Sequence, residues 1–189
     1  VQTCALPILG IYGGTFDPIH NGHLRVVVEL LSRKIVDSIV LIPAGQPRLR
    51  SAEPGADGKT RLEMCNLAIQ DLPVGIKDLV TVSDIEINRD GPTYAIDTVN
   101  ELTKSGAELF WIIGSDAYTN IDKWHRAEEL KELVNFIVID RPGSTEEESA
   151  LDIGALDISA TKVRQDQELH GVSPSVRKFI LERKLYASK

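Results

Sequence analysis

The chain of 189 residues has 42% hydrophobic and 26% charged residues and a net charge of -7. Its length suits one domain with a sizeable core, and the acidic balance argues against a nucleic-acid partner, which usually meets a basic face. No apolar run approaches the roughly 20 residues that span a bilayer, so a membrane protein is not expected.

The two cysteines and the start of the chain bear on environment and boundaries. Cys4 and Cys65 form no disulfide framework, which favours a reducing cytoplasm. Cys65 stands at an apolar position of a predicted helix and is expected to be an inert core thiol. Residues 1–8 carry no clear pattern, so we expect a non-native or disordered tail there and a single domain over residues 9–189.

Apolar patterns of strand and helix type alternate along the chain, with a polar loop over 46–59 that we take as a candidate mobile loop. Before that loop the predicted elements are strand 9–12, helix 24–31 and strand 38–42. After it they are helix 60–72, strand 79–87, helix 94–104, strand 109–113, helix 127–133, strand 136–139, helix 159–169 and a last helix that Ser173 caps and Pro174 opens. Such alternation predicts an α/β fold, a Rossmann-like doubly wound parallel sheet with helices on both faces.

The first strand runs into a turn over residues 13–23 with the sequence Gly-Gly-Thr-Phe-Asp-Pro-Ile-His-Asn-Gly-His. Doubly wound sheets bind ligands at the carboxyl ends of their strands, where this turn and Gly114 both fall. Glycines let the backbone approach a phosphate, and N–H groups at a helix start favour an anion. His20 and His23 should place both rings on one side, where they can donate hydrogen bonds and carry positive charge.

Two other interpretations of this histidine pair remain open. The pair could be purely structural. It could also bind a metal, but zinc usually takes at least three protein ligands. The only other histidines are His125 and His170, so we expect no protein-bound metal at the turn.

A second segment, residues 158–164 with the sequence Ile-Ser-Ala-Thr-Lys-Val-Arg, combines two hydroxyls and a basic residue at a predicted helix start. This arrangement suits the β- and γ-phosphates of a nucleotide. The segment resembles the Ile-Ser-x-Thr-x-x-Arg motif of the nucleotidylyltransferase superfamily. The turn over 13–23 resembles that superfamily's other signature, with its Thr/Ser-x-Gly-His core.

Three further segments resemble the bacterial nicotinate-nucleotide adenylyltransferases: residues 91–98 (Gly-Pro-Thr-Tyr-Ala-Ile-Asp-Thr), residues 113–117 followed by Trp124, and residues 141–143 (Arg-Pro-Gly). The resemblance covers Leu9 to about Tyr186. It implies an enzyme of NAD synthesis that joins nicotinate mononucleotide and ATP to give nicotinate adenine dinucleotide and pyrophosphate. The implied mechanism is direct attack of the mononucleotide phosphate on the α-phosphorus of ATP, with Mg²⁺ bound through the ATP phosphates.

The same resemblance implies a role for each matching residue. Catalysis falls to His20, His23 and Arg164. The implied ATP site consists of Gly13, Gly14, Thr15, Phe16, His20, His23, Gly114, Asp116, Ile158, Ser159, Thr161 and Arg164. The implied site for nicotinate mononucleotide consists of Gly14, Thr15, Phe16, Thr93, Tyr94, Trp124 and Arg48. Trp124 would stack on the pyridine ring, although a lone Trp is otherwise more often a core residue.

Two departures from the family pattern bear on substrate choice. Ala95 stands where the family usually has Thr, so a hydroxyl contact to the nicotinate carboxylate is missing, and the choice between nicotinate and nicotinamide stays open. A Pro-Pro-His-Lys segment of many members is replaced by residues 45–50, Gly-Gln-Pro-Arg-Leu-Arg, where Arg48 or Arg50 either meets substrate or is simply solvated.

The sequence leaves several alternative functions open. The nearest is an adenylyltransferase of the same superfamily that acts on nicotinamide mononucleotide or phosphopantetheine, and a cytidylyltransferase comes next. An alternative from a different class is a binding or regulatory protein that kept the fold and lost turnover. The sequence also leaves a homo-oligomer open.

Overall fold

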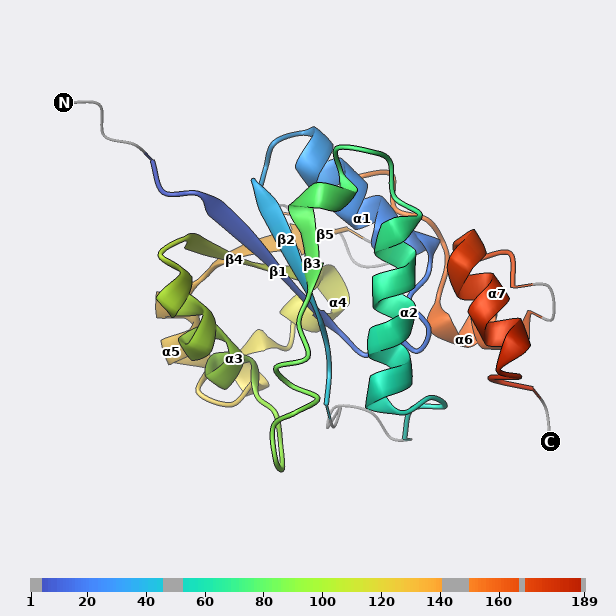
Figure 1. Ribbon diagram of the computed structural model, residues 1–189. Helices are drawn as coiled ribbons and strands as arrows, with labels where there is room; N and C mark the ends of the chain where they lie inside the picture. Colours follow the sequence, from blue (N-terminus) through green and yellow to red (C-terminus); the bar gives the residue numbers. More distant parts are fainter. Residues whose placement is uncertain (1–4, 46–52, 141–149, 167–168, 188–189) are drawn as a thin grey trace.

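The computed structural model describes residues 5–45, 53–140, 150–166 and 169–187. Its described strands form one parallel sheet in the order β3-β2-β1-β4-β5 (Figure 1). In register, Leu9 of β1 pairs with Ser38 of β2 on one side and Leu109 of β4 on the other. The strands are β1 (Ile8–Gly14), β2 (Ser38–Pro43), β3 (Val80–Val82), β4 (Glu108–Gly114) and β5 (Asn135–Ile139).

Helices cover both faces of this sheet, which confirms the predicted doubly wound arrangement (Figure 1). One face carries α1 (Asn21–Ser32), α2 (Gly58–Gln70) and α7 (Pro174–Glu182). The other face carries α3 (Ala95–Leu102) and α5 (Ala127–Leu133). The shorter elements are α4 (Ser115–Tyr118), α6 (Ala160–Gln165), η1 (Lys77–Leu79), η2 (Thr103–Ser105) and η3 (Ile121–Lys123).

Each face of the sheet has its own apolar core, because successive strand residues point to opposite faces. In β1, Ile11 joins the core beneath α3 and α5, and Tyr12 joins the core beneath α1 and α2. Cys65 of α2 is fully buried in the core beneath α1 and α2, as predicted, and burial raises the pKa of its thiol. No helix among the described residues is both long and apolar enough to cross a membrane.

The strand predicted over 79–87 was wrong beyond Val82. The backbone N–H of Ser83 still donates to the carbonyl of Leu41 on β2, at 2.9 Å. The next bond of a parallel ladder would come from residue 43, which is a proline and has no N–H. The chain therefore leaves the sheet and turns, with the N–H of Asn88 donating to the carbonyl of Asp84.

Two other elements differ from prediction at their ends. The helix predicted over 159–169 is only α6, which ends at Gln165. Asp166 leaves the helical conformation, and its carboxylate accepts from the N–H of His170 at 2.8 Å, a local bond that competes with helix continuation. The polar loop is shorter than predicted, because Asp57 caps α2 through the N–H of Thr60; its residues 46–52 lie outside the described ranges.

The last helix begins as predicted, with Ser173 at the N-cap and Pro174 as its first residue, although the Ser173 side chain makes no capping bond. Ser175 ties this helix to the end of α2. Its backbone N–H and its hydroxyl both donate to the carboxylate of Asp71, at 2.8 and 2.7 Å. The C-terminal segment is thereby docked on the face of the sheet that α2 covers.

Candidate active site

The order of the strands reverses between β1 and β4, and both strands end in glycine, at Gly14 and Gly114. In doubly wound sheets ligands bind outside the carboxyl ends of the strands at such a reversal. The two glycine-bearing turns that the sequence singled out therefore lie on neighbouring strands, at one edge of the sheet. Gly114 caps the short helix α4, and Asp116 is exposed in its first turn.

The turn between β1 and α1 is folded closely around the ring of Phe16. This side chain is 2% exposed, and its backbone has a φ of 50°, which bulky residues rarely adopt. A Cβ atom on Gly14 would lie 3.0 Å from the ring, tighter than ordinary contact. Glycine at position 14 thus lets the end of β1 approach the turn that follows it.

The rings of His20 and His23 stack at the start of α1, with centroids 3.7 Å apart and planes 27° from parallel. This confirms that both rings lie on one side. The backbone N–H of His20 donates to Nδ1 of His23 at 3.2 Å, so the neutral His23 ring carries its proton on Nε2. Gly22 leaves room for the pair, since a Cβ there would lie 3.0 Å from the His20 ring.

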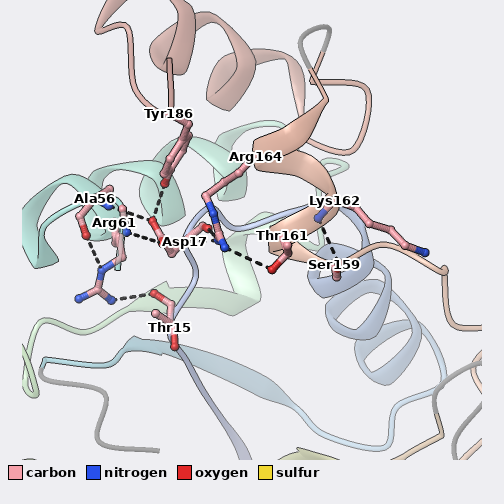
Figure 2. A network of polar contacts seen from close by, with 10 residues as sticks. Thr15, Asp17, Ala56, Arg61, Ser159, Thr161, Lys162, Arg164 and Tyr186 are labelled. Carbon is pink, nitrogen blue, oxygen red and sulfur yellow. Dashed lines mark hydrogen bonds and ion pairs between the residues drawn. The ribbon is translucent and has the colours of Figure 1, made fainter. Parts of the chain in front are cut away.

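Arg164 joins the second motif to the first (Figure 2). One guanidinium nitrogen donates to the backbone carbonyl of Asp17 at 2.5 Å and lies 3.5 Å from its carboxylate. The other donates to the hydroxyl of Thr161 at 3.2 Å. The carbonyl of Ile158 lies 3.7 Å from where a Cβ on Gly22 would stand. Two segments far apart in the chain therefore meet at one place.

The remaining hydroxyl of the second motif caps its own helix. Ser159 Oγ accepts from the backbone N–H of Lys162 at 3.2 Å, as Figure 2 shows. The Lys162 side chain turns to Asp157, with which it forms an exposed ion pair at 2.8 Å. Arg164, rather than Lys162, is therefore the cation that the second motif brings to the turn.

Beneath the turn lies a buried polar network that the sequence did not predict (Figure 2). Arg61 of α2 is 1% exposed and donates to the carbonyls of Thr15 and Ala44, each at 2.7 Å, and of Ala56 at 3.1 Å. Asp17 is 2% exposed and accepts from the N–H groups of Gly55 and Ala56 at 2.8 and 3.1 Å. Burial lowers the pKa of Arg61, and the charge of Asp17 opposes that shift.

Aromatic residues gather beside the carboxyl end of β1, on the face that α3 and α5 cover. The ring of Tyr94 lies against His125, with centroids 4.2 Å apart. Trp124 meets Trp111 edge to face at 6.0 Å, and Trp111 lies 3.2 Å from where a Cβ on Gly13 would stand. The structure thus brings the predicted Tyr94 and Trp124 segments to one wall, while Trp124 is also partly a core residue.

Glu86 is a buried carboxyl group next to this wall. It is 8% exposed and accepts from the hydroxyl of Thr98 at 2.8 Å, to which Arg89 also donates at 3.2 Å. Gly45 passes so close that a Cβ there would lie 2.1 Å from the Glu86 carbonyl oxygen and 3.3 Å from the Thr93 methyl group. Glycine is therefore required at position 45, directly before the segment that holds Arg48.

We expect Glu86→Gln to raise the melting temperature at pH 7 by no more than a few degrees. Burial raises the pKa of Glu86 above its ordinary value, so this group lowers the free energy of unfolding as pH rises from the ordinary pKa to the raised one, and the loss stays constant above that. Glutamine keeps an oxygen for the Thr98 hydroxyl and carries no charge. Thermal melts at pH 7 and pH 4 check this: the difference should shrink at pH 4, and a glutamine variant less stable at pH 7 would contradict it.

Three predicted features lie outside the described residues: Arg48, Arg50 and the segment 141–143. Within the described ranges, no three side chains of His, Cys, Asp or Glu come together as a set that could hold a metal ion. The polar groups at the end of β1 are instead two imidazoles, one guanidinium and hydroxyls, a donor set that favours an anion.

Comparisons with known proteins identify the family and the fold of the chain. Residues 11–166 match the cytidylyltransferase-like family. The nicotinate-nucleotide adenylyltransferase of Bacillus subtilis (strain 168) is 35% identical over 191 residues, 95% of this chain and 98% of that protein. The solved Plasmodium falciparum nicotinic acid mononucleotide adenylyltransferase complexed with NaAD has the same fold, with a TM-score of 0.78 at 22% identity over 95% of this chain and 97% of its own. The same protein complexed with APC gives 0.76 at 21% over the same shares. The chain belongs to the nicotinate-nucleotide adenylyltransferase family.

Proposed function

We propose that this enzyme transfers the adenylyl group of ATP to nicotinate mononucleotide, giving nicotinate adenine dinucleotide and pyrophosphate. The observation that carries the proposal is the bond from Arg164 to the Asp17 carbonyl. It brings the guanidinium of the second motif to the turn that ends in His20 and His23. Three cationic or proton-donating groups then surround one place at the carboxyl end of β1, where a triphosphate can bind.

The transfer itself asks little covalent chemistry of the protein. A phosphate oxygen of the mononucleotide forms a bond to the α-phosphorus of ATP, and the bond from that phosphorus to the β-phosphate oxygen breaks. Charge builds on the oxygens of the α-phosphate and on the leaving pyrophosphate. Stabilising that charge and aligning the two substrates must supply the rate.

Each donor of the site has a role in this transfer. The Nε2 proton of His23 faces the α-phosphate, together with His20. Arg164 uses two of its N–H groups on Asp17 and Thr161, and the others bind the β- and γ-phosphates. The hydroxyls of Ser159 and Thr161 accept bonds through oxygen and keep their own hydrogens to donate.

The remaining parts of ATP and of the mononucleotide bind on opposite sides of the point where the strand order reverses. On the ATP side, the backbone of residues 13–16 and Ile158 lines the phosphates, and Gly114 and Asp116 meet the ribose. On the other side, Gly14, Thr15 and Phe16 also border the mononucleotide phosphate. We expect the pyridine ring to lie on Trp124, with Thr93 and Tyr94 around it.

The start of α3 supports nicotinate rather than nicotinamide as the preferred base. Tyr94 is the N-cap of this helix and Ala95 its first residue. The first N–H groups of a helix have no partner within it, and they favour a negative group. The backbone N–H of the partly exposed Ala95 can therefore hold the nicotinate carboxylate, although no side-chain hydroxyl is present at this position.

Mg²⁺ fits this site as a companion of ATP. The carboxylate of Asp17 is committed to Gly55, Ala56 and Tyr186, so it is a poor metal ligand. A magnesium ion brought in by ATP would keep water ligands and would need no protein cage. It would neutralise charge on the phosphates, while Arg164 and the histidines donate the protein's own hydrogen bonds to them.

A cytoplasmic location and small-molecule partners complete the proposal. The free thiol of Cys65, buried in α2, is compatible with a reducing compartment. The negative net charge of the chain disfavours a polyanionic nucleic acid as partner. ATP and nicotinate mononucleotide are the partners for which the site has matching groups.

One assay tests the substrate assignment. Pyrophosphate release is measured with ATP and, in parallel, nicotinate mononucleotide, nicotinamide mononucleotide or phosphopantetheine. We expect turnover with nicotinate mononucleotide and a kcat/KM about 10- to 100-fold lower with the amide, because the amide offers no charged partner to the backbone N–H groups of α3. Equal rates with acid and amide would remove that selectivity. Turnover with phosphopantetheine alone would overturn the proposed function.

A further inference from the structure

The C-terminal segment reaches back to the first motif through Tyr186. Its hydroxyl donates to the carboxylate of Asp17 at 2.7 Å (Figure 2). Its ring packs over Gly55, where a Cβ would lie 3.1 Å from two ring atoms. The backbone of Tyr186 has a φ of 61°, a left-handed conformation that costs a non-glycine residue free energy. The surrounding contacts hold the residue in that conformation.

Asp17 is the junction between this tyrosine and Arg164. Its carboxylate accepts from Tyr186 and from the N–H groups of Gly55 and Ala56, while its backbone carbonyl accepts from Arg164. A second oxygen of the same carboxylate lies 3.5 Å from the Arg164 guanidinium. A carboxylate has about four lone-pair sites, and three of them accept the hydrogen bonds from Tyr186, Gly55 and Ala56. Asp17 therefore contacts Arg164 through both its carbonyl and its carboxylate.

The tyrosine is a dependable donor in this network. Burial and the neighbouring Asp17 carboxylate raise the pKa of Tyr186, so its hydroxyl stays protonated. Gly55 and Ala56 lie just before α2, whereas Tyr186 lies beyond α7. The carboxylate is thus held from the segments next to two helices that cover the same face of the sheet.

We propose that Tyr186 is a positioning residue for the phosphates of ATP: it orients Asp17, which in turn places the guanidinium of Arg164. This inference rests on the proposed function for the identity of the ligand. It predicts that the tyrosine affects the handling of ATP and leaves the handling of the mononucleotide unchanged. A residue that only stabilises the fold would not discriminate between the two substrates.

The variant Tyr186→Phe tests this, because it keeps the ring over Gly55 and removes only the donor. We expect kcat/KM for ATP to fall about tenfold, with KM for nicotinate mononucleotide unchanged. Ser175→Ala is the matched control. It also removes a hydroxyl that donates to a carboxylate at 2.7 Å and docks α7 on α2, but its partner is Asp71. The control should keep wild-type kinetics for both substrates.

A double-mutant cycle between Tyr186 and Arg164 gives the decisive measurement. ATP binding, followed by titration calorimetry, is compared for wild type, Tyr186→Phe, Arg164→Ala and the double variant. If the tyrosine acts through the arginine, Tyr186→Phe weakens binding in the wild type and changes it little in the Arg164→Ala background. Equal losses in both backgrounds, an equal loss in Ser175→Ala, or an equal effect on both substrates would overturn the inference.

The binding measurement also separates this inference from the proposed function. Wild-type protein that binds ATP but does not turn over nicotinate mononucleotide would contradict the function alone, and the cycle could still be completed. Turnover of nicotinate mononucleotide with a Tyr186→Phe variant indistinguishable from wild type would contradict the inference alone.

Discussion

Replacing His23 by alanine is expected to lower turnover about 10²- to 10³-fold, as the loss of one transition-state donor does elsewhere. The Nδ1 atom of His23 accepts from the backbone of His20, so the neutral ring carries its proton on Nε2. Alanine removes that donor at the step in which charge builds on the α-phosphate. Steady-state rates of pyrophosphate release with saturating ATP and nicotinate mononucleotide measure the change.

Two further variants show whether the loss is chemical. His23→Gln keeps an N–H donor and should recover part of the rate. His170→Ala removes an exposed imidazole next to α6 and should leave the rate near that of wild type. The two His23 variants should melt within a few degrees of wild type, since α1 keeps its buried face, and so should His170→Ala, which removes an exposed side chain. A His23→Ala enzyme with near-normal turnover and an unchanged melt would remove this residue from the mechanism.

Replacing Arg61 by alanine is expected to lower the free energy of unfolding by about 3–5 kcal/mol. The guanidinium is buried and donates to the carbonyls of Thr15, Ala44 and Ala56. Alanine leaves these oxygens without their donor and takes from the buried Asp17 carboxylate one of its two nearby cations, the other being Arg164. Urea unfolding curves measure the loss of free energy. In thermal melts the same loss should appear as a fall in melting temperature of about 10 °C.

The controls for Arg61 separate burial from charge. Arg183→Ala removes a guanidinium that is half exposed and pairs with Glu63 at 3.5 Å; a surface pair of this kind is worth at most about 1 kcal/mol. Arg61→Lys keeps the charge but cannot span three carbonyls at once, so it should lie between wild type and Arg61→Ala. A loss for Arg61→Ala no larger than that for Arg183→Ala would show that the buried network contributes little.

Much of the architecture could be predicted because its signals are local. The alternation of strand and helix follows from the spacing of apolar residues along each segment, and it identified the parallel sheet and the elements on both of its faces. The strand over 79–87 failed for a reason that its own residues do not contain. Its pairing stops at Val82 because the neighbouring strand presents Pro43, and which strands are neighbours is decided only by the fold.

The candidate site also combines features that the sequence predicts with features that depend on tertiary contacts. Its two motifs could be recognised from sequence because glycines, histidines, hydroxyls and one arginine at fixed spacing carry their chemistry within a few residues. The sequence by itself thus determined the fold class and singled out the turn over 13–23 as the candidate phosphate site. Only the tertiary structure decided that Arg61 is buried and that Tyr186 meets Asp17, because an arginine on a helix looks like any solvated surface charge. Burial depends on which distant elements cover a side chain, and here the first turn, α2 and the C-terminal segment together exclude water from one carboxylate.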